Sequence, residues 1–351
     1  MHRALATTAA GLGALLSYAA EPAEAEASPL NGSLFQAQQF DVDRDITVDL
    51  GHGMLNLWRA QRSELCLHVT EAPTSPPEEF YAGVRDDIVK SPIGSQTFHD
   101  LSNSELTLCI GDIEIQQNNR AYYRPDLRYA ALPLFRDRNL LYSTSIEEVR
   151  HGWQHHVGLM RGDEDGHRRT QQEYLAGMYL VEGEAHAFTV AVAYEMRKAG
   201  DSRPWDSYAA PDGPYNGLIT AFEQSLADAG VGPEDTPTNQ QMRDAMSAVF
   251  EAWLNNKVFT DFYSTFHQRH LTDRDHSPVD MDVLVSQLAT RLESLPSGDR
   301  PDLFLTRRHM EMVVEKAFEY QPPPNYRPAS EQGQSPAAPA TINSGPARGP
   351  F

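Results

Sequence analysis

The sequence contains little cysteine, fewer basic than acidic residues and no long hydrophobic run after Ala20. Its two cysteines, Cys66 in "ELCLHV" and Cys109 in "LTLCIG", stand in alternating, strand-like contexts without a recognisable histidine partner nearby. Cysteine-based catalysis therefore finds no support. Two interpretations of the pair remain open: a disulfide if the chain is exported, or two small buried hydrophobic side chains if it is cytoplasmic.

The charge of the chain excludes several classes of partner. Basic residues number 29 against 49 acidic ones, which gives a formal net charge of -20. Such a chain repels polyanions, so we expect no nucleic-acid partner and no binding to an acidic membrane surface. The sequence also lacks the "GxSxG" pattern of serine hydrolases and the "GxxxxGK" pattern of phosphate-binding loops. Serine catalysis of that type and nucleotide-driven chemistry are therefore not expected.

The N-terminal segment, residues 1–28, has features of a secretory signal peptide. A single arginine precedes an uncharged run from Ala4 to Ala20, and sites with small residues follow. If this segment is a signal peptide, the protein is periplasmic or secreted; if it is a disordered alanine-rich leader, the protein is cytoplasmic. No later stretch approaches the roughly 18 to 20 apolar residues that a membrane helix needs, so we expect no stable membrane span.

Periodicity and composition divide the rest of the chain into three parts. Residues 29–115 are typical of a small mixed α/β region, with strands in "DITVDL", "SELCLHV" and "ELTLCIGDIEIQ" and a short helix in "PPEEFYAGVRDDIVK". Residues 116–320 begin with an extended pair or hairpin in "AYYRPDLRYAALPLF" and then show helical periodicity. Residues 321–351 are rich in Pro, Ala, Ser and Gly and are predicted to be disordered.

The predicted fold class is mainly α, of the α+β type. The predicted helices span residues 139–160, 169–199, 216–229, 239–255, 259–268, 280–295 and 306–318.

The stretch "STSIEEVRHGWQHH" has the highest concentration of residues capable of chemistry. On a helix with about 100° per residue, two carboxylates and two imidazoles share one polar arc. These residues are Glu147, Glu148, His151 and His155. The apolar stripe that we expect to face the core consists of Tyr142, Ile146, Val149, Trp153, Val157 and Met160. The predicted helix is therefore amphipathic.

A second predicted helix has a similar set of residues in "YLVEGEAHAF". Glu182, His186 and Tyr179 lie on one side of this helix, whereas Glu184 points to the opposite side. Two facing helices that each offer Glu and His one turn apart can enclose a divalent metal ion. Imidazole nitrogen and carboxylate oxygen both suit zinc.

Structural explanations of the same residues remain open. The runs "TSIE" and "SIEE" each fit a capping box at a helix start. Glu182 and His186 also fit an ordinary polar pair on a solvated helix face.

Three short motifs resemble those of a zincin-like family of helical, mostly bacterial metallopeptidases that is catalogued as a domain of unknown function. Family members have "x-Y-x-P" near a strand, "L-A-H-E-L-R-H-x-W-Q" on a helix and "L-E-A-D-A" on a later helix. Here "YYRPDLRYAAL", "TSIEEVRHGWQ" and "LVEGEAHAF" are similar to them, as is the downstream "VFEAWLNNKVFTDFYSTF". The resemblance covers about residues 121–266 and implies a zincin-like helical domain with a site of the HExxH…E type.

The resemblance implies a role for each matching residue. Glu148 matches the catalytic glutamate, His151 the second metal-binding histidine and Glu182 the third ligand. Glu147 stands where the family has its first metal-binding histidine, so the motif here is Glu-Glu-x-x-His. A carboxylate can bind zinc, but it makes the site more anionic.

A second register of the motif is also open. His151-Gly-Trp-Gln-His155 keeps two histidines at the spacing that places both on one helix face, but Gly152 replaces the glutamate that would act as base. In this register metal binding survives and the usual base is absent.

Together these features predict a zinc-dependent peptidase that acts on a peptide or protein substrate. The residues predicted to bind zinc are His151, Glu182 and either Glu147 or His155. Glu148 is the predicted general base. We expect His186 or Tyr179 to orient a ligand or to stabilise the developing oxyanion.

Two other functions remain open. The altered first ligand also fits a catalytically inactive relative that serves as an interaction or scaffold protein. Glu148-Val-Arg-His151 is a Glu-x-x-His motif, as in di-iron carboxylate bundles, although the spacing from Glu182 to His186 is one residue longer. Metal content separates the first alternative from the enzyme, and the visible absorbance of bound iron would reveal the second.

Overall fold

The structure is a computed structural model that describes residues 66–74, 76–110, 121–125, 127–132, 138–160, 170–211, 213–266 and 279–320. The predicted leader, the predicted strand in "DITVDL" and the predicted disordered tail lie outside these residues.

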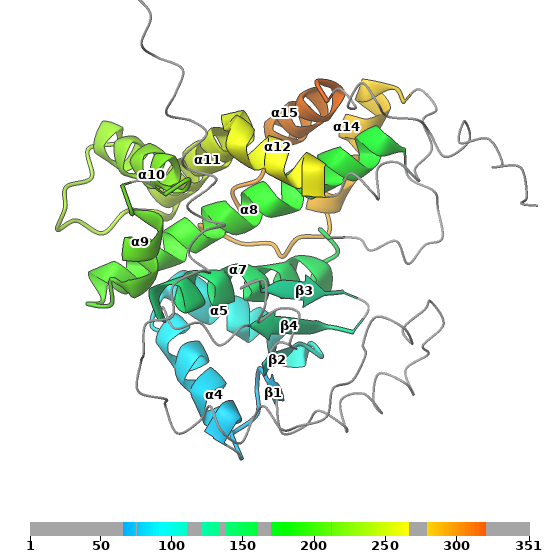
Figure 1. The fold of residues 1–351 in the computed structure, drawn as a ribbon. Helices are drawn as coiled ribbons and strands as arrows, with labels where there is room; N and C mark the ends of the chain where they lie inside the picture. Colours follow the sequence, from blue (N-terminus) through cyan, green and yellow to red (C-terminus); the bar gives the residue numbers. More distant parts are fainter. Residues whose placement is uncertain are drawn as a thin grey trace, which may run out of the picture.

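The described residues form a mainly helical protein with one small mixed sheet, which confirms the predicted fold class (Figure 1). The strands are β1 (Cys66–His68), β2 (Thr107–Ile110), β3 (Tyr122–Arg124) and β4 (Tyr129–Leu132). Their order in the sheet is β1-β2-β4-β3, with β2 and β4 parallel and the other two pairs antiparallel. β3 and β4 are the hairpin that the sequence indicates. The sheet includes strands from both sides of residue 115, and the domain boundary placed there stays a prediction.

Each helix predicted after residue 116 is present, with ends displaced by no more than about one turn. The helices are α4 (Pro76–Ile88), α5 (Pro92–Asp100), α7 (Arg138–His156), α8 (Gln171–Lys198), α9 (Arg203–Tyr208), α10 (Asn216–Asp228), α11 (Asn239–Asn255), α12 (Lys257–Phe266), α14 (Met281–Leu292) and α15 (Arg307–Phe318). In the described part of the chain, no helix is both long enough and apolar enough to cross a membrane.

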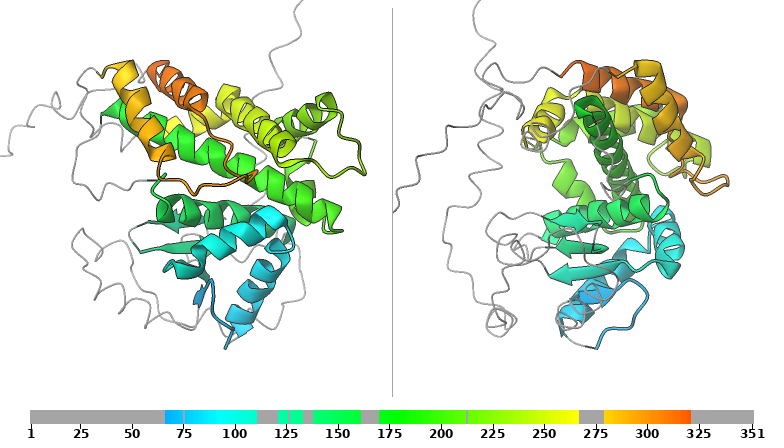
Figure 2. Two further views of the ribbon diagram at one scale, coloured as in Figure 1. Left: turned by 180° about the vertical axis from the view of Figure 1, so that it is seen from behind. Right: turned by 90° about the vertical axis from the view of Figure 1, so that its right-hand side faces the viewer.

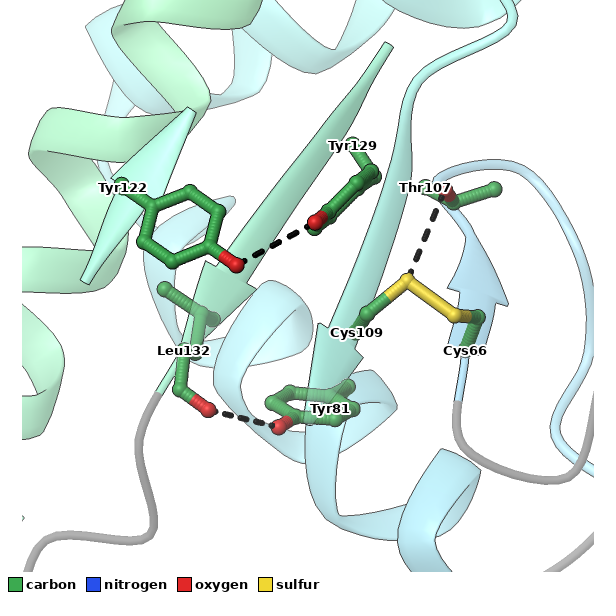
Figure 3. The surroundings of a disulfide bond; sticks show 7 residues. All are labelled: Cys66, Tyr81, Thr107, Cys109, Tyr122, Tyr129 and Leu132. Carbon is green, nitrogen blue, oxygen red and sulfur yellow. Dashed lines mark hydrogen bonds between the residues drawn. A yellow bond between two sulfur atoms is a disulfide. The ribbon is translucent and has the colours of Figure 1, made fainter. Parts of the chain in front are cut away.

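A disulfide joins Cys66 to Cys109 (Figure 3). The two residues lie directly opposite each other in the antiparallel pairing of β1 with β2. On the same sheet, the hydroxyl of Tyr81 from α4 donates a hydrogen bond to the carbonyl of Leu132 on β4 (3.3 Å). Of the two interpretations of the cysteines, the structure has the disulfide, which ties the edge strand β1 to the rest of the sheet.

Helix α7 lies between the sheet and α8 (Figure 1 and Figure 2). Its apolar stripe is buried as predicted at Ile146, Val149 and Trp153, which are at most 1% exposed. The indole of Trp153 donates to Asp100 at the end of α5 (2.8 Å). The stripe therefore anchors α7 against the N-terminal part of the fold, and its opposite face meets α8.

Helix α8 is the central helix of the molecule. Its start is fixed by a capping box, in which the Thr170 hydroxyl accepts from the backbone of Glu173 and the Glu173 carboxylate accepts from the backbone of Thr170. Helices α7, α9, α11 and α15 pack against it. Because α8 is covered on several sides, polar groups within it must pair with polar groups of its neighbours or with a bound ligand.

Helices α5 and α9 were not predicted from the sequence. Both are short and have a proline in the first turn. In α9, six residues are too few to display a helical period. Its last residue, Tyr208, reaches the site described next.

Candidate metal centre

Glu147 on α7 converges with Glu182 and His186 on α8. One ligand atom of each residue, a carboxylate oxygen or an imidazole nitrogen, lies within 4.8 Å of those of the other two. Glu182 and His186 point the same way because they are four residues apart on one helix. The packing of α7 on α8 therefore brings together three side chains that can bind one divalent ion.

Each of the two helices contributes one glutamate and one histidine, and the histidine of each helix lies near the glutamate of the other. We call these two pairs the crossed pairs. His186 Nε2 on α8 lies 3.6 Å from Glu147 Oε1 on α7. His151 Nε2 on α7 lies 3.8 Å from Glu182 Oε2 on α8. Both distances are too long for a hydrogen bond. They are slightly longer than the roughly 3.3 Å between two ligands of a tetrahedral zinc with bonds of about 2.0 Å.

Both imidazoles are held through their other ring nitrogen. Nδ1 of His151 lies 2.8 Å from Gln154 Oε1, and Nδ1 of His186 lies 2.9 Å from the hydroxyl of Tyr208. Among the described residues, the fully buried Nε2 of His186 has no hydrogen-bond partner. A histidine that binds a metal through Nε2 usually has its Nδ1 occupied in this way.

Aromatic side chains surround His186. Its ring contacts those of Tyr208, Tyr215, Trp253 and Phe259 at centroid distances of 5.3 to 6.1 Å. This burial, with a contribution from nearby His151, lowers the pKa of His186 to about 3. The ring is therefore neutral near pH 7, which is the form that binds metals.

Glu148 is adjacent to this group and is buried, with 6% of its surface exposed. Its Oε2 has no hydrogen-bond partner within the described ranges. Burial raises the pKa of Glu148 well above its usual value, and the negative charges of Glu147 and Glu182 add to the effect. A carboxylate with an unpaired oxygen and a raised pKa beside a donor cluster is suited to accepting a proton.

The charge of the cluster favours a cation. Burial raises the pKa of Glu147 to about 8, and the charge of Glu182 adds to this, whereas the hydrogen bond from Tyr208 lowers it. Where the structure describes the chain, these carboxylates have histidines and no lysine or arginine as ion-pair partners. A divalent cation would relieve the repulsion among carboxylates held this close together.

Both structural explanations of these residues are wrong. The runs "TSIE" and "SIEE" do not begin a helix, because α7 starts at Arg138 and the hydroxyl of Ser145 donates to the carbonyl of Leu141 within the helix. The face that carries Glu182 and His186 is not solvated, because their side chains are 16% and 1% exposed.

The remaining residues predicted from the sequence lie outside the converging group. The Nδ1 of His155 pairs with the hydroxyl of Tyr123 on β3 at 2.8 Å. The hydroxyl of Tyr179 donates to the carbonyl of Thr260 on α12 at 3.4 Å. The structure thus brings together Glu147, Glu182 and His186, with His151 and Glu148 beside them, and does not bring His155 or Tyr179 to this group.

Gly152, which occupies the position of the base in the second register, faces the core. A Cβ atom at this position would lie 2.7 Å from Cδ2 of Leu106. The position has no room for a larger side chain, so the second register does not place a base next to the candidate metal centre.

The sequence interpretation missed the residues that hold the donors. Gln154 is the last residue of the matched stretch "TSIEEVRHGWQ", but the sequence assigned it no role, and its contact with His151 was visible only as an i, i+3 spacing on a helix. Tyr208 came without any signal, whereas Tyr263 lies in the downstream motif "VFEAWLNNKVFTDFYSTF", for which the sequence assigned no role to a single residue. Burial raises the pKa of Tyr263 on α12 well above the usual value, and the negative charges of Glu182 and Glu147 add to the effect.

An ionic network between α7 and α8 lies beside the cluster. Glu184, which the sequence places opposite Glu182, pairs with Arg150 of α7, and both side chains are at most 1% exposed. Arg150 also pairs with Asp302 at 3.1 Å. This network holds α7 and α8 together next to the donors.

A sequence profile described as "Putative metallopeptidase family (DUF6782)" matches residues 59–301, a range that includes the whole cluster. No curated protein and no solved structure matches the chain. The matched range exceeds half of the 351 residues. The chain therefore belongs to this family, whose description is that of a metallopeptidase.

Proposed function

We propose that this protein is a zinc-dependent peptidase. Its zinc ion is held by three of the four donors in the crossed pairs, Glu147 and His151 from α7 with Glu182 and His186 from α8, and one position stays open for water. Glu148 is the general base. The observation that carries the proposal is the convergence of Glu147, Glu182 and His186 within 4.8 Å across the helix interface.

The donor set fits zinc chemically. Imidazole nitrogen and carboxylate oxygen are common zinc ligands, and spacings of 3.6 and 3.8 Å between donors need little adjustment to close around an ion. The buried, unpartnered Nε2 of His186 gains a partner when an ion binds. Family membership supports the same metal chemistry.

The side chains around the ion have different roles in hydrolysis. When bound, zinc would polarise the peptide carbonyl and lower the pKa of a water molecule toward about 7. Glu148 takes a proton from the water whose oxygen attacks the carbonyl carbon. It then delivers that proton to the amine nitrogen as the carbon–nitrogen bond breaks. Tyr208 hydrogen-bonds Nδ1 of His186 and lowers the pKa of the neighbouring Glu147, so it helps to position these two donors.

The number of protein donors favours a second candidate function. Catalytic zinc sites usually have three protein ligands and one position for water, whereas four ligands close the shell of a structural site. If all four donors bind at once, the centre stabilises the packing of α7 on α8 without catalysis, and the protein acts as an interaction or scaffold protein.

The variant Glu148→Gln separates these functions. Because it removes the base and keeps the size and the donors, it should retain bound zinc and lose hydrolysis of a casein-derived peptide library by a factor of at least about 100. Zinc is measured by mass spectrometry and hydrolysis by the appearance of new amino termini.

Glu195→Gln is the matched control. Glu195 is a partly buried glutamate of α8 that accepts from Ser91 and from the backbone of Ile93, away from the cluster. This variant should keep both zinc and activity. Undiminished hydrolysis in Glu148→Gln removes Glu148 from the role of base. Zinc without any hydrolysis in the wild type favours the closed structural site.

A further inference from the structure

Gln154 is fully buried one turn after His151 on α7 and joins α7 to α8. Its Oε1 lies 2.8 Å from Nδ1 of His151. Its Nε2 lies 2.7 Å from the carbonyl oxygen of Val181 and 2.5 Å from Oε2 of Glu184. All three partners are polar atoms of buried residues, so each contact must join a donor to an acceptor.

Two of these partners determine the orientation of the amide. The carbonyl of Val181 can only accept a hydrogen bond. The carboxylate of Glu184 is paired with the guanidinium of Arg150, so it is also an acceptor. The NH2 group of Gln154 must therefore face Val181 and Glu184, which leaves its carbonyl oxygen facing His151.

The orientation of the amide in turn fixes the proton of His151. The carbonyl oxygen of Gln154 can only accept, so Nδ1 of His151 must donate. A neutral imidazole with its proton on Nδ1 has its lone pair on Nε2. Nε2 of His151 is the atom that lies 3.8 Å from Oε2 of Glu182, in the candidate metal centre.

We propose that Gln154 is a positioning residue that holds His151 in the Nδ1–H tautomer, with the lone pair of Nε2 directed at the metal centre. The anchor of Gln154 is the buried ion pair of Arg150 with Glu184, which Asp302 extends. The expected effect on metal binding rests on the proposed function. The tautomer of His151 does not, because Gln154 determines it in the metal-free protein as well.

The network also explains why α8 carries glutamates on opposite faces. Glu182 faces the centre, and Glu184 reaches its partners on α7 from the other side. Replacing Gln154 by leucine keeps a similar volume and removes the acceptor for His151. The imidazole is then free to place its proton on Nε2, where it opposes metal binding.

The test uses the full chain labelled with 15N-histidine. Long-range proton–nitrogen spectra of the metal-free wild type distinguish the two tautomers, and the signal that disappears in His151→Asn identifies His151. The expected result is the Nδ1–H tautomer in the wild type and its loss in Gln154→Leu. Zinc affinity, measured by competition with a chromophoric chelator, should fall about 10- to 100-fold in Gln154→Leu.

Gln171→Ala is the matched control, because Gln171 is also a buried glutamine, at the start of α8. It should leave the tautomer of His151 and the zinc affinity unchanged. An Nε2–H tautomer in the wild type overturns the inference without any variant, and so does an unchanged tautomer in a folded Gln154→Leu. A wild type that shows the expected tautomer and binds no zinc refutes the proposed function and leaves the role of Gln154 toward His151 standing.

Discussion

His309 lies in the first turn of α15, is 3% exposed, and has hydrogen-bond partners at both ring nitrogens. Nδ1 accepts from the backbone of Thr306 (2.9 Å), and Nε2 lies 2.7 Å from the hydroxyl of Ser247. Protonation of Nδ1 would break the bond to Thr306. Burial, with a contribution from Arg308, lowers the pKa of His309 to about 4.

This pKa predicts a loss of stability in weak acid. The unfolded chain binds a proton at His309 below about pH 6.5, whereas the folded protein does so only near pH 4. The free energy of unfolding therefore falls as the pH drops through this window. Glutamine at the same position can keep the bond to Thr306. Between pH 7 and pH 4, the free energy of unfolding of His309→Gln should therefore fall by up to about 3 kcal/mol less than that of the wild type.

Urea unfolding at several pH values measures this difference. His99→Gln is the control, since the side chain of His99 is 81% exposed. The free energy of unfolding of this variant should depend on pH as it does in the wild type. Equal pH slopes for the wild type and His309→Gln would contradict the assignment.

Residue types in the motif were sufficient to find most of the donors. Glu147, His151 and Glu182 were predicted as candidates because their spacing on two helices is visible in the sequence. His186 was predicted only as a supporting residue, and the structure places it among the three converging donors. Its distance to Glu147 depends on how α7 packs on α8, which no local pattern contains.

At the scale of elements, long periodic helices were predictable and short ones were not. The 28 residues of α8 show their period several times over, whereas α9 has six residues. The sequence predicts a polar arc on α7, but periodicity cannot tell a face that meets water from one that meets another helix. Burial of that arc results from tertiary packing against α8 and α9.

Two glycines of α8 differ in their surroundings, and this gives a test of the packing of α8 on α11. A Cβ atom on Gly183 would lie 3.0 Å from Cε2 of Phe250 and 3.2 Å from Cε3 of Trp253. The nearest atom to a Cβ on Gly177 would be 3.8 Å away, at the end of Arg291. Close approach of α8 to α11 therefore requires glycine at residue 183 and not at 177.

Gly183→Ala should destabilise the protein by about 1 to 3 kcal/mol because two buried rings must move. Gly177→Ala should be neutral or stabilise it by up to about 1 kcal/mol, since alanine is the better helix former. Midpoints of thermal or urea unfolding compare the two. A Gly183→Ala protein as stable as Gly177→Ala would mean that α8 and α11 are less closely packed than described.

At the scale of the whole molecule, the fold joins a small sheet and a set of helices through one continuous core. Buried residues from Leu67 in β1 to Ala317 in α15 belong to the same apolar cluster. The candidate metal centre lies in the middle, between α7 and α8, so its geometry depends on elements that are far apart in the sequence. The residue types that could bind a metal could therefore be predicted from the sequence, whereas their arrangement in space could not.

The disulfide acts at the same scale, because it closes a loop across the N-terminal part of the fold. Cys66 and Cys109 are 43 residues apart, and closing a loop of that length restricts the unfolded chain by about 4 kcal/mol in the chain-entropy account. The double variant Cys66→Ala/Cys109→Ala should unfold at a lower urea concentration. It should keep its zinc, since the disulfide joins β1 to β2 and not α7 to α8. Wild type in the presence of a reductant should show a similar loss. Equal stability of the oxidised wild type and the double variant would contradict this role.

The most direct test of the account is the metal content of the purified protein, prepared without chelators. Mass spectrometry should find about one zinc ion per chain in the wild type, and little in Glu182→Ala or His186→Ala. His155→Ala should keep its zinc, because the partner of His155 is Tyr123. The absence of zinc from the wild type, or its retention in both folded variants at Glu182 and His186, would contradict the proposal that the crossed pairs of α7 and α8 form a metal centre.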